Sequence, residues 1–398
     1  MNPDHDSLDL GALPWGGDPA ACIVGLAARI GRRFRREAPG AALADSRIDD
    51  AIADSRHVVL LLFDGLGDRQ VRTLIPGGAI ADCRGGALRS VFPSSTAPAI
   101  TSFATATFPA AHANPGWLCW NDAQRAVVRT LPMDLRGAPD QPVAPETIWD
   151  WRSASLDFGL PVVSIQPDFI ADSAFSRHAW AGARRVGYRT ADELVAAVEQ
   201  AVRGHPDGGF VWAYLPQFDS VSHERGWQSE PAADVARRFD LLFERLAGRL
   251  RDTGALLLAT ADHGFVDVPA SQQLRLDDFP ELAALLERPL TGEPRVVYCK
   301  ARAGHEEAFE EAARATLGFA FHVLPSPALV DAGWFGPGPA SHRLAGRIGS
   351  HTLVGRDRYT LVDRVPGEPE PAFVGMHGGI HPDELAVPLA AVRRGAPP

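Results

Sequence analysis

The sequence predicts an α/β fold: a doubly wound, mostly parallel sheet with a small inserted α+β cap. Short apolar runs of strand length alternate with stretches of helical period, as in a parallel sheet covered by helices. Acidic and histidine residues follow several of these runs, where open α/β sheets place their ligands. From about residue 270 the elements become shorter and are separated by Gly and Pro. We therefore expect residues 271–345 to form the cap, and residues 1–270 with 346–398 to form the core.

The elements can be placed in order along the chain. The first is an amphipathic helix over residues 20–37 with a basic end. Continuous apolar runs predict buried strands over 57–63, 161–165, 209–215 and 255–260, and helical periodicity predicts helices over 69–74, 192–202 and 232–252. Within the cap we expect helices over 280–286 and 305–317 and strands over 295–300 and 319–324. The Pro- and Trp-rich stretch 117–151 is expected to be a loop, and residues 353–362 a hairpin.

Composition narrows the class of protein and its partners. The 398 residues are 45% hydrophobic and 22% charged, with a formal net charge of −10. This charge argues against a protein that binds nucleic-acid polymers or anionic membranes. No stretch is apolar enough to span a membrane, and the N-terminal residues lack the pattern of a signal peptide. The four cysteines are scattered, with no CxxC pair, which favours a cytoplasmic location.

A stretch rich in hydroxyl groups, residues 90–109, is the strongest candidate for a nucleophile. Ser94, Ser95 and Thr96 follow an apolar segment and precede a run that can form a helix, with Pro98 tolerated in its first turn. A hydroxyl at a helix N-terminus lies beside free N–H groups that favour an anion, which suits attack on phosphate. The alternative is an ordinary N-cap hydroxyl.

Three aspartates and three histidines follow the predicted strand ends. Each short motif, such as Asp-His-Gly, is common by chance, but their joint occurrence is not. Nitrogen and oxygen donors of this kind form two ligand sets that Zn²⁺ or Mn²⁺ accepts. Two such cations about 4 Å apart would activate a hydroxyl nucleophile and clamp the phosphate oxygens. The candidate ligands are Asp64, Asp219, His223, Asp262, His263 and His377, with Thr96 as nucleophile.

On these motifs, and on Phe92-Pro-Ser-Ser-Thr96-x-Pro98, the sequence resembles the alkaline phosphatase superfamily and within it the type I phosphodiesterase/nucleotide pyrophosphatase family. The resemblance covers roughly residues 57–385. It implies a hydrolase of phosphodiester or phosphoanhydride bonds that uses two zinc ions, a phosphothreonine intermediate and a small phosphorylated substrate such as a nucleotide. It also implies that Asp219, His223 and His377 hold one ion, and that Asp64, Asp262 and His263 hold the other with Thr96 bridging towards it.

The sequence departs from the family pattern on the substrate side. Family members carry an Asn that hydrogen-bonds a phosphate oxygen, and in this chain the family's spacing falls on Trp117. Asn114 or Asn121 could take that role. Trp117 and Phe218 could belong to an aromatic wall for a nucleobase, or to the core. Asn114, Trp117 and Phe218 are thus the candidate substrate-binding residues.

Other activities compete with this interpretation. The run His377-Gly-Gly-Ile-His-Pro-Asp-Glu384 resembles the C-terminal motif of cofactor-independent phosphoglycerate mutases, although those enzymes carry a Ser nucleophile and a long inserted domain. A phosphomonoesterase, a phosphomutase or a phosphonate hydrolase of the same superfamily is therefore the alternative. A metal-binding scaffold without catalytic activity is the alternative from a different class of protein.

Overall fold

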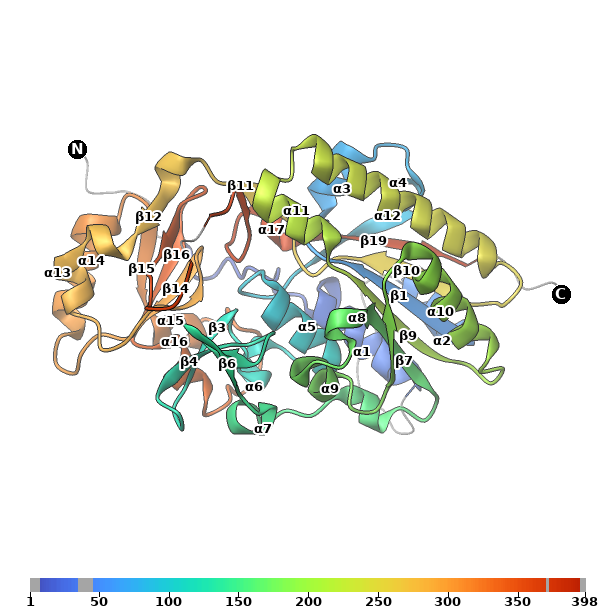
Figure 1. Ribbon diagram of the computed structural model, residues 1–398, viewed down its shortest axis with the longest axis horizontal. Helices are drawn as coiled ribbons and strands as arrows, with labels where there is room; N and C mark the ends of the chain where they lie inside the picture. Colours follow the sequence, from blue (N-terminus) through green and yellow to red (C-terminus); the bar gives the residue numbers. More distant parts are fainter. Residues whose placement is uncertain (1–7, 35–45, 370–371, 394–398) are drawn as a thin grey trace.

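A seven-stranded sheet forms the centre of the larger part of the molecule (Figure 1). The computed structural model describes residues 8–34, 46–369 and 372–393. The order of the strands is β2-β19-β10-β1-β9-β7-β8; the five from β10 to β8 are parallel, and β19 runs antiparallel to both β10 and β2. They comprise β1 (His57–Phe63), β2 (Arg84–Arg89), β7 (Val162–Pro167), β8 (Arg184–Tyr188), β9 (Gly209–Leu215), β10 (Leu256–Thr260) and β19 (Ala386–Val392). The mostly parallel, doubly wound α/β fold is confirmed.

Helices cover both faces of this sheet, so the middle strands β1, β9 and β10 are buried along their whole length. One face packs against α3 (Asp68–Leu74), α4 (Ala79–Asp82), α10 (Ala191–Arg203), α11 (Gln217–Arg225) and α12 (Glu230–Arg249). The other face packs against α1 (Ile23–Phe34), α2 (Ser46–Asp54), α5 (Thr96–Thr105) and α9 (Ala174–Ala179). The three predicted core helices are confirmed as α3, α10 and α12. The expected helix over 20–37 is α1, and residues 35–37 lie outside the described residues.

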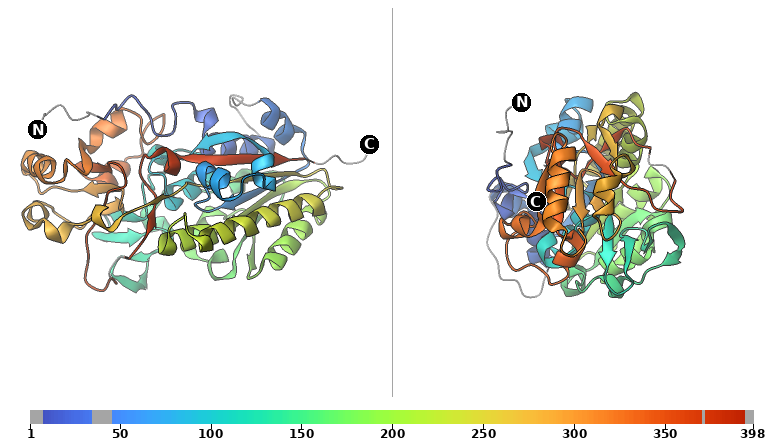
Figure 2. Two further views of the ribbon diagram at one scale, coloured as in Figure 1. Left: turned by 90° about the horizontal axis from the view of Figure 1, so that it is seen from above. Right: turned by 90° about the vertical axis from the view of Figure 1, so that its left-hand side faces the viewer.

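A second sheet lies at one end of the molecule, with α13 (Pro280–Ala284), α14 (Glu306–Leu317) and α15 (Ser326–Asp331) beside it (Figure 2). Its eight strands are antiparallel, in the order β15-β16-β14-β13-β3-β4-β5-β6. They comprise β3 (Leu118–Asn121), β4 (Ala126–Arg129), β5 (Asp134–Leu135), β6 (Ala138–Pro142), β13 (Thr291–Glu293), β14 (Val296–Cys299), β15 (Phe321–Pro325) and β16 (His351–Gly355).

This sheet corrects two predictions. The stretch 117–151 is not a loop, because it supplies β3 to β6; strands of two to five residues are too short to display a period. Residues 353–362 are not a hairpin. Instead β16 pairs with β14 and β15, whereas β17 (Thr360–Val362) pairs with β12 (Gln273–Arg275). Two short apolar runs on either side of a turn look like a hairpin locally, but each of these strands finds its partner elsewhere.

The second sheet takes strands from 118–142 as well as from 291–355, so it draws on more of the chain than residues 271–345. The division into a core and an inserted cap stays a prediction.

The remaining elements are β11 (Val266–Asp267), which pairs with β18 (Gly375–Met376), and α6 (Pro109–His112), α7 (Pro145–Ile148), α8 (Asp168–Ala171), α16 (Leu344–Ile348) and α17 (Pro382–Leu385). Among the described helices, none combines the length and apolar character needed to cross a bilayer.

Candidate active site

The candidate ligands meet at the carboxyl ends of three neighbouring strands. Asp64 directly follows β1, Asp219 lies in the first turn of α11 after β9, and Asp262 and His263 follow β10. These strands are adjacent in the order β10-β1-β9, so their ends lie at one edge of the sheet. His377 comes from far along the chain, directly after β18, which pairs with β11 just beyond His263.

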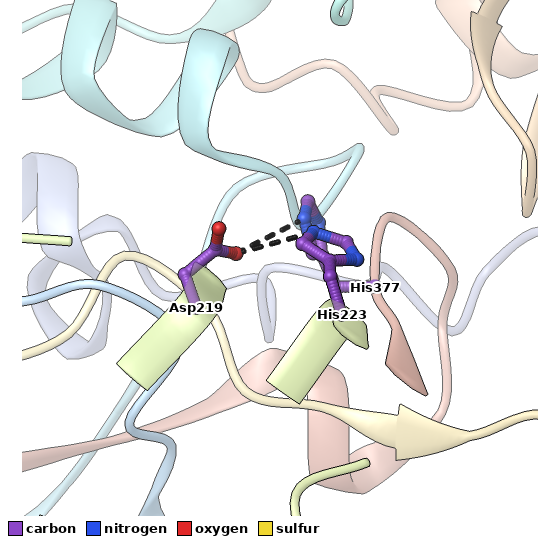
Figure 3. Close-up of side chains that lie close together, drawn as sticks. All are labelled: Asp219, His223 and His377. Atoms are coloured by element: carbon purple, nitrogen blue, oxygen red, sulfur yellow. Dashed lines mark ion pairs between the residues drawn. The ribbon is translucent and has the colours of Figure 1, made fainter. Parts of the chain in front are cut away.

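Asp219, His223 and His377 form the first ligand group (Figure 3). Asp219 and His223 are four residues apart on α11, which places them on the same side of the helix. Asp219 Oδ1 lies 3.3 Å from His223 Nε2 and 3.6 Å from His377 Nε2. The three donor atoms therefore face one point from two separate segments of the chain.

Asp64, Asp262 and His263 form the second ligand group, and all three are buried. His263 Nε2 lies 3.4 Å from Asp64 Oδ1 and 3.6 Å from Asp262 Oδ2. The backbone N–H groups of Gly65 and His263 both donate to Asp262 Oδ1, each at 3.0 Å, which leaves Oδ2 free to face the site. The two groups adjoin, since His263 Nε2 is also 4.0 Å from Asp219 Oδ1.

The other ring nitrogen of each histidine contacts a backbone carbonyl. His223 Nδ1 lies 2.9 Å from the Gly375 oxygen, His263 Nδ1 lies 3.0 Å from the Gly264 oxygen, and His377 Nδ1 lies 3.3 Å from the Ser94 oxygen. A neutral imidazole that donates through Nδ1–H keeps its lone pair on Nε2. The protein thus orients three Nε2 atoms as acceptors, as metal-binding histidines are oriented.

The carboxylates of the site need positive charge between them. Burial, together with the charge of Asp219, raises the pKa of Asp64 well above its usual range. Burial and the charge of Asp64 do the same for the pKa of Asp262. Asp219 Oδ1 and Asp262 Oδ2 are buried without a hydrogen bond to a described residue. Unpartnered buried carboxylate oxygens facing imidazole nitrogens fit divalent cations of the Zn²⁺ or Mn²⁺ type.

Thr96 is the first residue of α5 and lies beside the second ligand group. Its Oγ1 is 3.0 Å from His263 Nε2 and 3.4 Å from Asp64 Oδ1. Ser95 occupies the N-cap position, but its side chain does not cap the helix. Its hydroxyl donates instead to Glu293 Oε1 at 2.5 Å, and the Ser94 hydroxyl donates to the Gly379 carbonyl at 2.8 Å. No hydroxyl of this turn acts as a helix cap, so the first-turn N–H groups stay available for an anion.

A cavity of about 510 Å³ opens beside Thr96 and both ligand groups. Its apolar wall is formed by Trp117, Leu131, Pro294, Val362, Phe373 and Met376. Trp117 therefore lines the same cavity as Thr96, and its role in binding a substrate stays a prediction. Its backbone N–H donates to Glu293 Oε1 at 2.7 Å. Burial raises the pKa of Glu293 to about 7, against the opposing effect of its bonds with Ser95 and Trp117.

Two other substrate-side candidates lie away from this cavity. Asn114 is fully buried behind α5, where its Nδ2 donates to the Ala97 carbonyl at 3.3 Å and to Thr101 Oγ1 at 2.9 Å. Phe218 is fully buried in the core and packs edge-on against Phe265. Neither side chain lines the cavity beside Thr96.

Three further groups that shape the site are missed by sequence reasoning. Tyr214 lies near the end of a buried apolar strand and carries no motif of its own, yet its hydroxyl donates to Asp64 Oδ2. Glu293 lies in a strand of three residues, so no spacing marks it. Glu384 accepts from the N–H groups of Gly379 and His381, at 2.9 and 3.2 Å, and so fixes the loop that follows His377. The one sequence signal for a role of Glu384 is its place at the end of the motif that runs from His377 to Glu384.

Comparison with known families agrees with this geometry. The sequence model of the type I phosphodiesterase/nucleotide pyrophosphatase family matches residues 58–380. The chain belongs to this family. The resemblance to the alkaline phosphatase superfamily is therefore confirmed, and the protein is a hydrolase of that superfamily. The family is metal-dependent, and the two ligand groups are this member's candidate metal sites. No curated protein sequence matches the chain.

Solved structures share its fold at low sequence identity. Human ectonucleotide pyrophosphatase/phosphodiesterase 5 superposes with a TM-score of 0.65 at 14% identity, over 84% of this chain and 87% of that one. The murine protein gives 0.62 at 15% identity with the same coverage, and an inactive form of it has been solved with AMP. Phosphonoacetate hydrolase from Sinorhizobium meliloti 1021, in complex with phosphonoformate, gives 0.59 at 19% identity, over 85% and 90% of the two chains.

Proposed function

We propose that this family member hydrolyses a phosphodiester or phosphoanhydride bond of a small phosphorylated substrate through Thr96, with two divalent metal ions. The observation that carries the proposal is the position of Thr96 Oγ1, 3.0 Å from His263 Nε2 at the N-terminus of α5 and beside both ligand groups. When bound, two cations, most suitably Zn²⁺ for a set of Asp and His donors, would lower the pKa of the nucleophile and offset charge on the phosphate oxygens.

The chain's own groups then have defined tasks. Thr96 Oγ1 loses its proton to solvent and attacks phosphorus, and the bond to the leaving group breaks. The phosphorus, with its retained group, thus passes to Thr96 before water releases it. The first-turn N–H groups of α5 face the incoming anion. Tyr214 holds Asp64 through its hydroxyl, and the Gly65 and His263 amides hold Asp262. Both carboxylates are thus oriented before substrate arrives.

Diesters are the favoured substrates because the cavity is larger than a phosphate group requires. It measures about 510 Å³, and its lining includes an apolar wall of six side chains besides Thr96 and the ligand residues. A second ester group can contact this wall, whereas a monoester leaves it exposed to water. A diester that contains a nucleoside is one such substrate; the murine relative's inactive form has been solved in complex with the nucleotide AMP.

The test compares hydrolysis of bis-p-nitrophenyl phosphate and p-nitrophenyl phosphate, each with added Zn²⁺ or Mn²⁺. We expect the diester to be cleaved faster, Thr96→Ala to lose at least about 10³-fold in kcat, and Thr96→Ser to retain part of the activity. A preference for the monoester would support the phosphatase or phosphomutase alternative. An unchanged rate in Thr96→Ala would refute the role of Thr96. Cleavage of neither ester by a metal-loaded protein would favour a phosphonate hydrolase or a scaffold.

We further propose a cytoplasmic location. Within the described residues no disulfide joins Cys22, Cys83, Cys119 and Cys299 to one another, as is usual in a reducing compartment. Labelling with a thiol reagent after denaturation, with and without prior reduction, checks this state. Equal labelling of four thiols is expected, and fewer thiols without reduction would contradict it.

A further inference from the structure

The cavity beside Thr96 has a charge balance that restricts its substrate. Among the described residues that line it, none is Lys or Arg, whereas Asp64, Asp219 and Glu293 are acidic. Asp64 and Asp219 belong to the two ligand groups, but Glu293 belongs to neither. Glu293 is therefore an acidic group of the cavity whose charge is not offset by the proposed metal ions.

Glu293 is built into the wall as a fixed acceptor. The residue is 5% exposed, and its Oε1 accepts from the Ser95 hydroxyl and the Trp117 amide. Within the described part of the chain, both hydrogen bonds to the Glu293 carboxylate end on Oε1, and no Lys or Arg pairs with it. The side chain is thus held in one orientation, with an oxygen left for a donor on the substrate.

A neighbouring hollow of about 320 Å³ continues the cavity and shares Trp117, Glu293, Pro294 and Val362 with it. Two arginines line this hollow, but both are already paired. Arg129 bonds Asp134 through two contacts of 2.6 Å, and Arg136 pairs with Asp363 and Glu368, each at 2.8 Å. An anionic substrate group that reaches this far would meet arginines whose charge is already neutralised.

We infer that the site selects phosphodiesters whose retained group, the one that stays on phosphorus when the leaving group departs, is apolar and either uncharged or positively charged. A hydroxyl or amino donor on that group would bond to Glu293, and its apolar part would contact Trp117, Pro294 and Val362. A second anionic group is disfavoured because it would approach Glu293 without a compensating cation. This inference rests on the proposed function and narrows its substrate class.

The test uses three p-nitrophenyl phosphodiesters whose retained groups are phenyl, 4-(aminomethyl)phenyl and 4-carboxyphenyl. Their binding to zinc-loaded Thr96→Ala is measured by calorimetry at pH 8.5, which requires no turnover. We expect the aminomethyl compound to bind at least about tenfold more tightly than the carboxyl compound, with the phenyl compound between them. Equal binding of all three, or tightest binding of the carboxyl compound, would overturn the inference.

The role of Glu293 itself is tested by the ratio of those two affinities. Glu293→Gln keeps the size of the side chain and an oxygen for Ser95, so in the Thr96→Ala background the ratio should fall towards one, whatever happens to the absolute affinities. The matched control is Glu287→Gln, an exposed carboxylate of the same part of the molecule, which should leave the ratio unchanged. If the ratio of the two affinities is the same with and without Glu293→Gln, the assignment of the charge selection to Glu293 is overturned. The order of binding of the three esters is measured in Thr96→Ala alone, so that result does not depend on the Glu293 variant folding.

The outcomes separate the two proposals. If the three esters bind in the expected order but the unmodified protein cleaves none of them, the proposed reaction fails and the charge selection stands. If they are cleaved at equal kcat/KM and bind equally, the reaction stands and the charge selection fails.

Discussion

Replacing Glu384 by Gln should destabilise the whole molecule, because Glu384 is one half of a fully buried ion pair. Arg295 and Glu384 are both 0% exposed, with Arg295 Nε 2.6 Å from Oε1 and Nη2 2.9 Å from Oε2. The same two oxygens accept from the Gly379 and His381 amides. Glu384→Gln leaves one oxygen for four donors and an uncompensated guanidinium.

The size of the effect follows from these contacts. Breaking a buried ion pair by removing one partner costs about 3–5 kcal/mol. For a chain of 398 residues the entropy of unfolding at the midpoint is about 0.84 kcal/mol/K, so the melting temperature should fall by about 4–6 °C. Because the Gly379 and His381 amides belong to the loop after His377, zinc affinity should also fall, by roughly 10–100-fold.

Thermal unfolding followed by circular dichroism, in EDTA, measures the stability effect without contribution from metal binding. Glu193→Gln is the control; it removes a carboxylate from an exposed pair with Arg189 and should shift the melting temperature by less than about 1 °C. Removing the Arg295 guanidinium as well, in the double variant Arg295→Met/Glu384→Gln, should recover part of the lost melting temperature because no buried charge then stays unpaired. A melting temperature for Glu384→Gln within about 1 °C of the unmodified protein would refute this reasoning.

Three further predictions concern the site and its support. Asp219→Ala and Asp262→Ala should each bind about one zinc ion per chain instead of two; elemental analysis after gel filtration checks this, and two retained ions would contradict the ligand assignment. Gly264→Ala should lower both the melting temperature and the zinc content, because a Cβ there would lie 2.0 Å from the Asp383 carbonyl oxygen. A variant with the melting temperature and zinc content of the unmodified protein would contradict this, since the backbone would then have moved to accommodate the methyl group. Burial, with a smaller contribution from a nearby arginine, lowers the pKa of His112 to about 3. The folded protein therefore binds fewer protons than the unfolded chain, where the pKa is ~6.5, and stability is lost as pH falls from ~6.5 towards 3, by ~1.4 kcal/mol per unit. Between pH 7.5 and 5 in EDTA, His112→Gln should lose about 2 °C less in melting temperature than the unmodified protein; equal losses would contradict it.

Much of the fold was predictable because the central strands carry their own signal. Residues 57–63, 209–215 and 255–260 are continuous apolar runs, and a strand buried on both faces of a sheet must be apolar throughout. The second sheet was not predictable. Strands such as β5, with two residues, have no period, and their stability comes from neighbours far along the chain.

The same contrast holds at the site. The sequence by itself determined the ligand residues and Thr96 as candidates, since each is a residue type able to bind a metal ion or attack phosphorus that follows a strongly apolar strand or lies in a distinctive motif. Only the tertiary structure decided how they are supported: Ser95 meets Glu293 across 198 residues of sequence, and Arg295 meets Glu384 across 89. It also removed Asn114 and Phe218 from the cavity wall and placed Glu293 there. Local sequence records which residues can react or be buried, whereas contacts between distant segments depend on the packing of the whole chain and leave no local pattern.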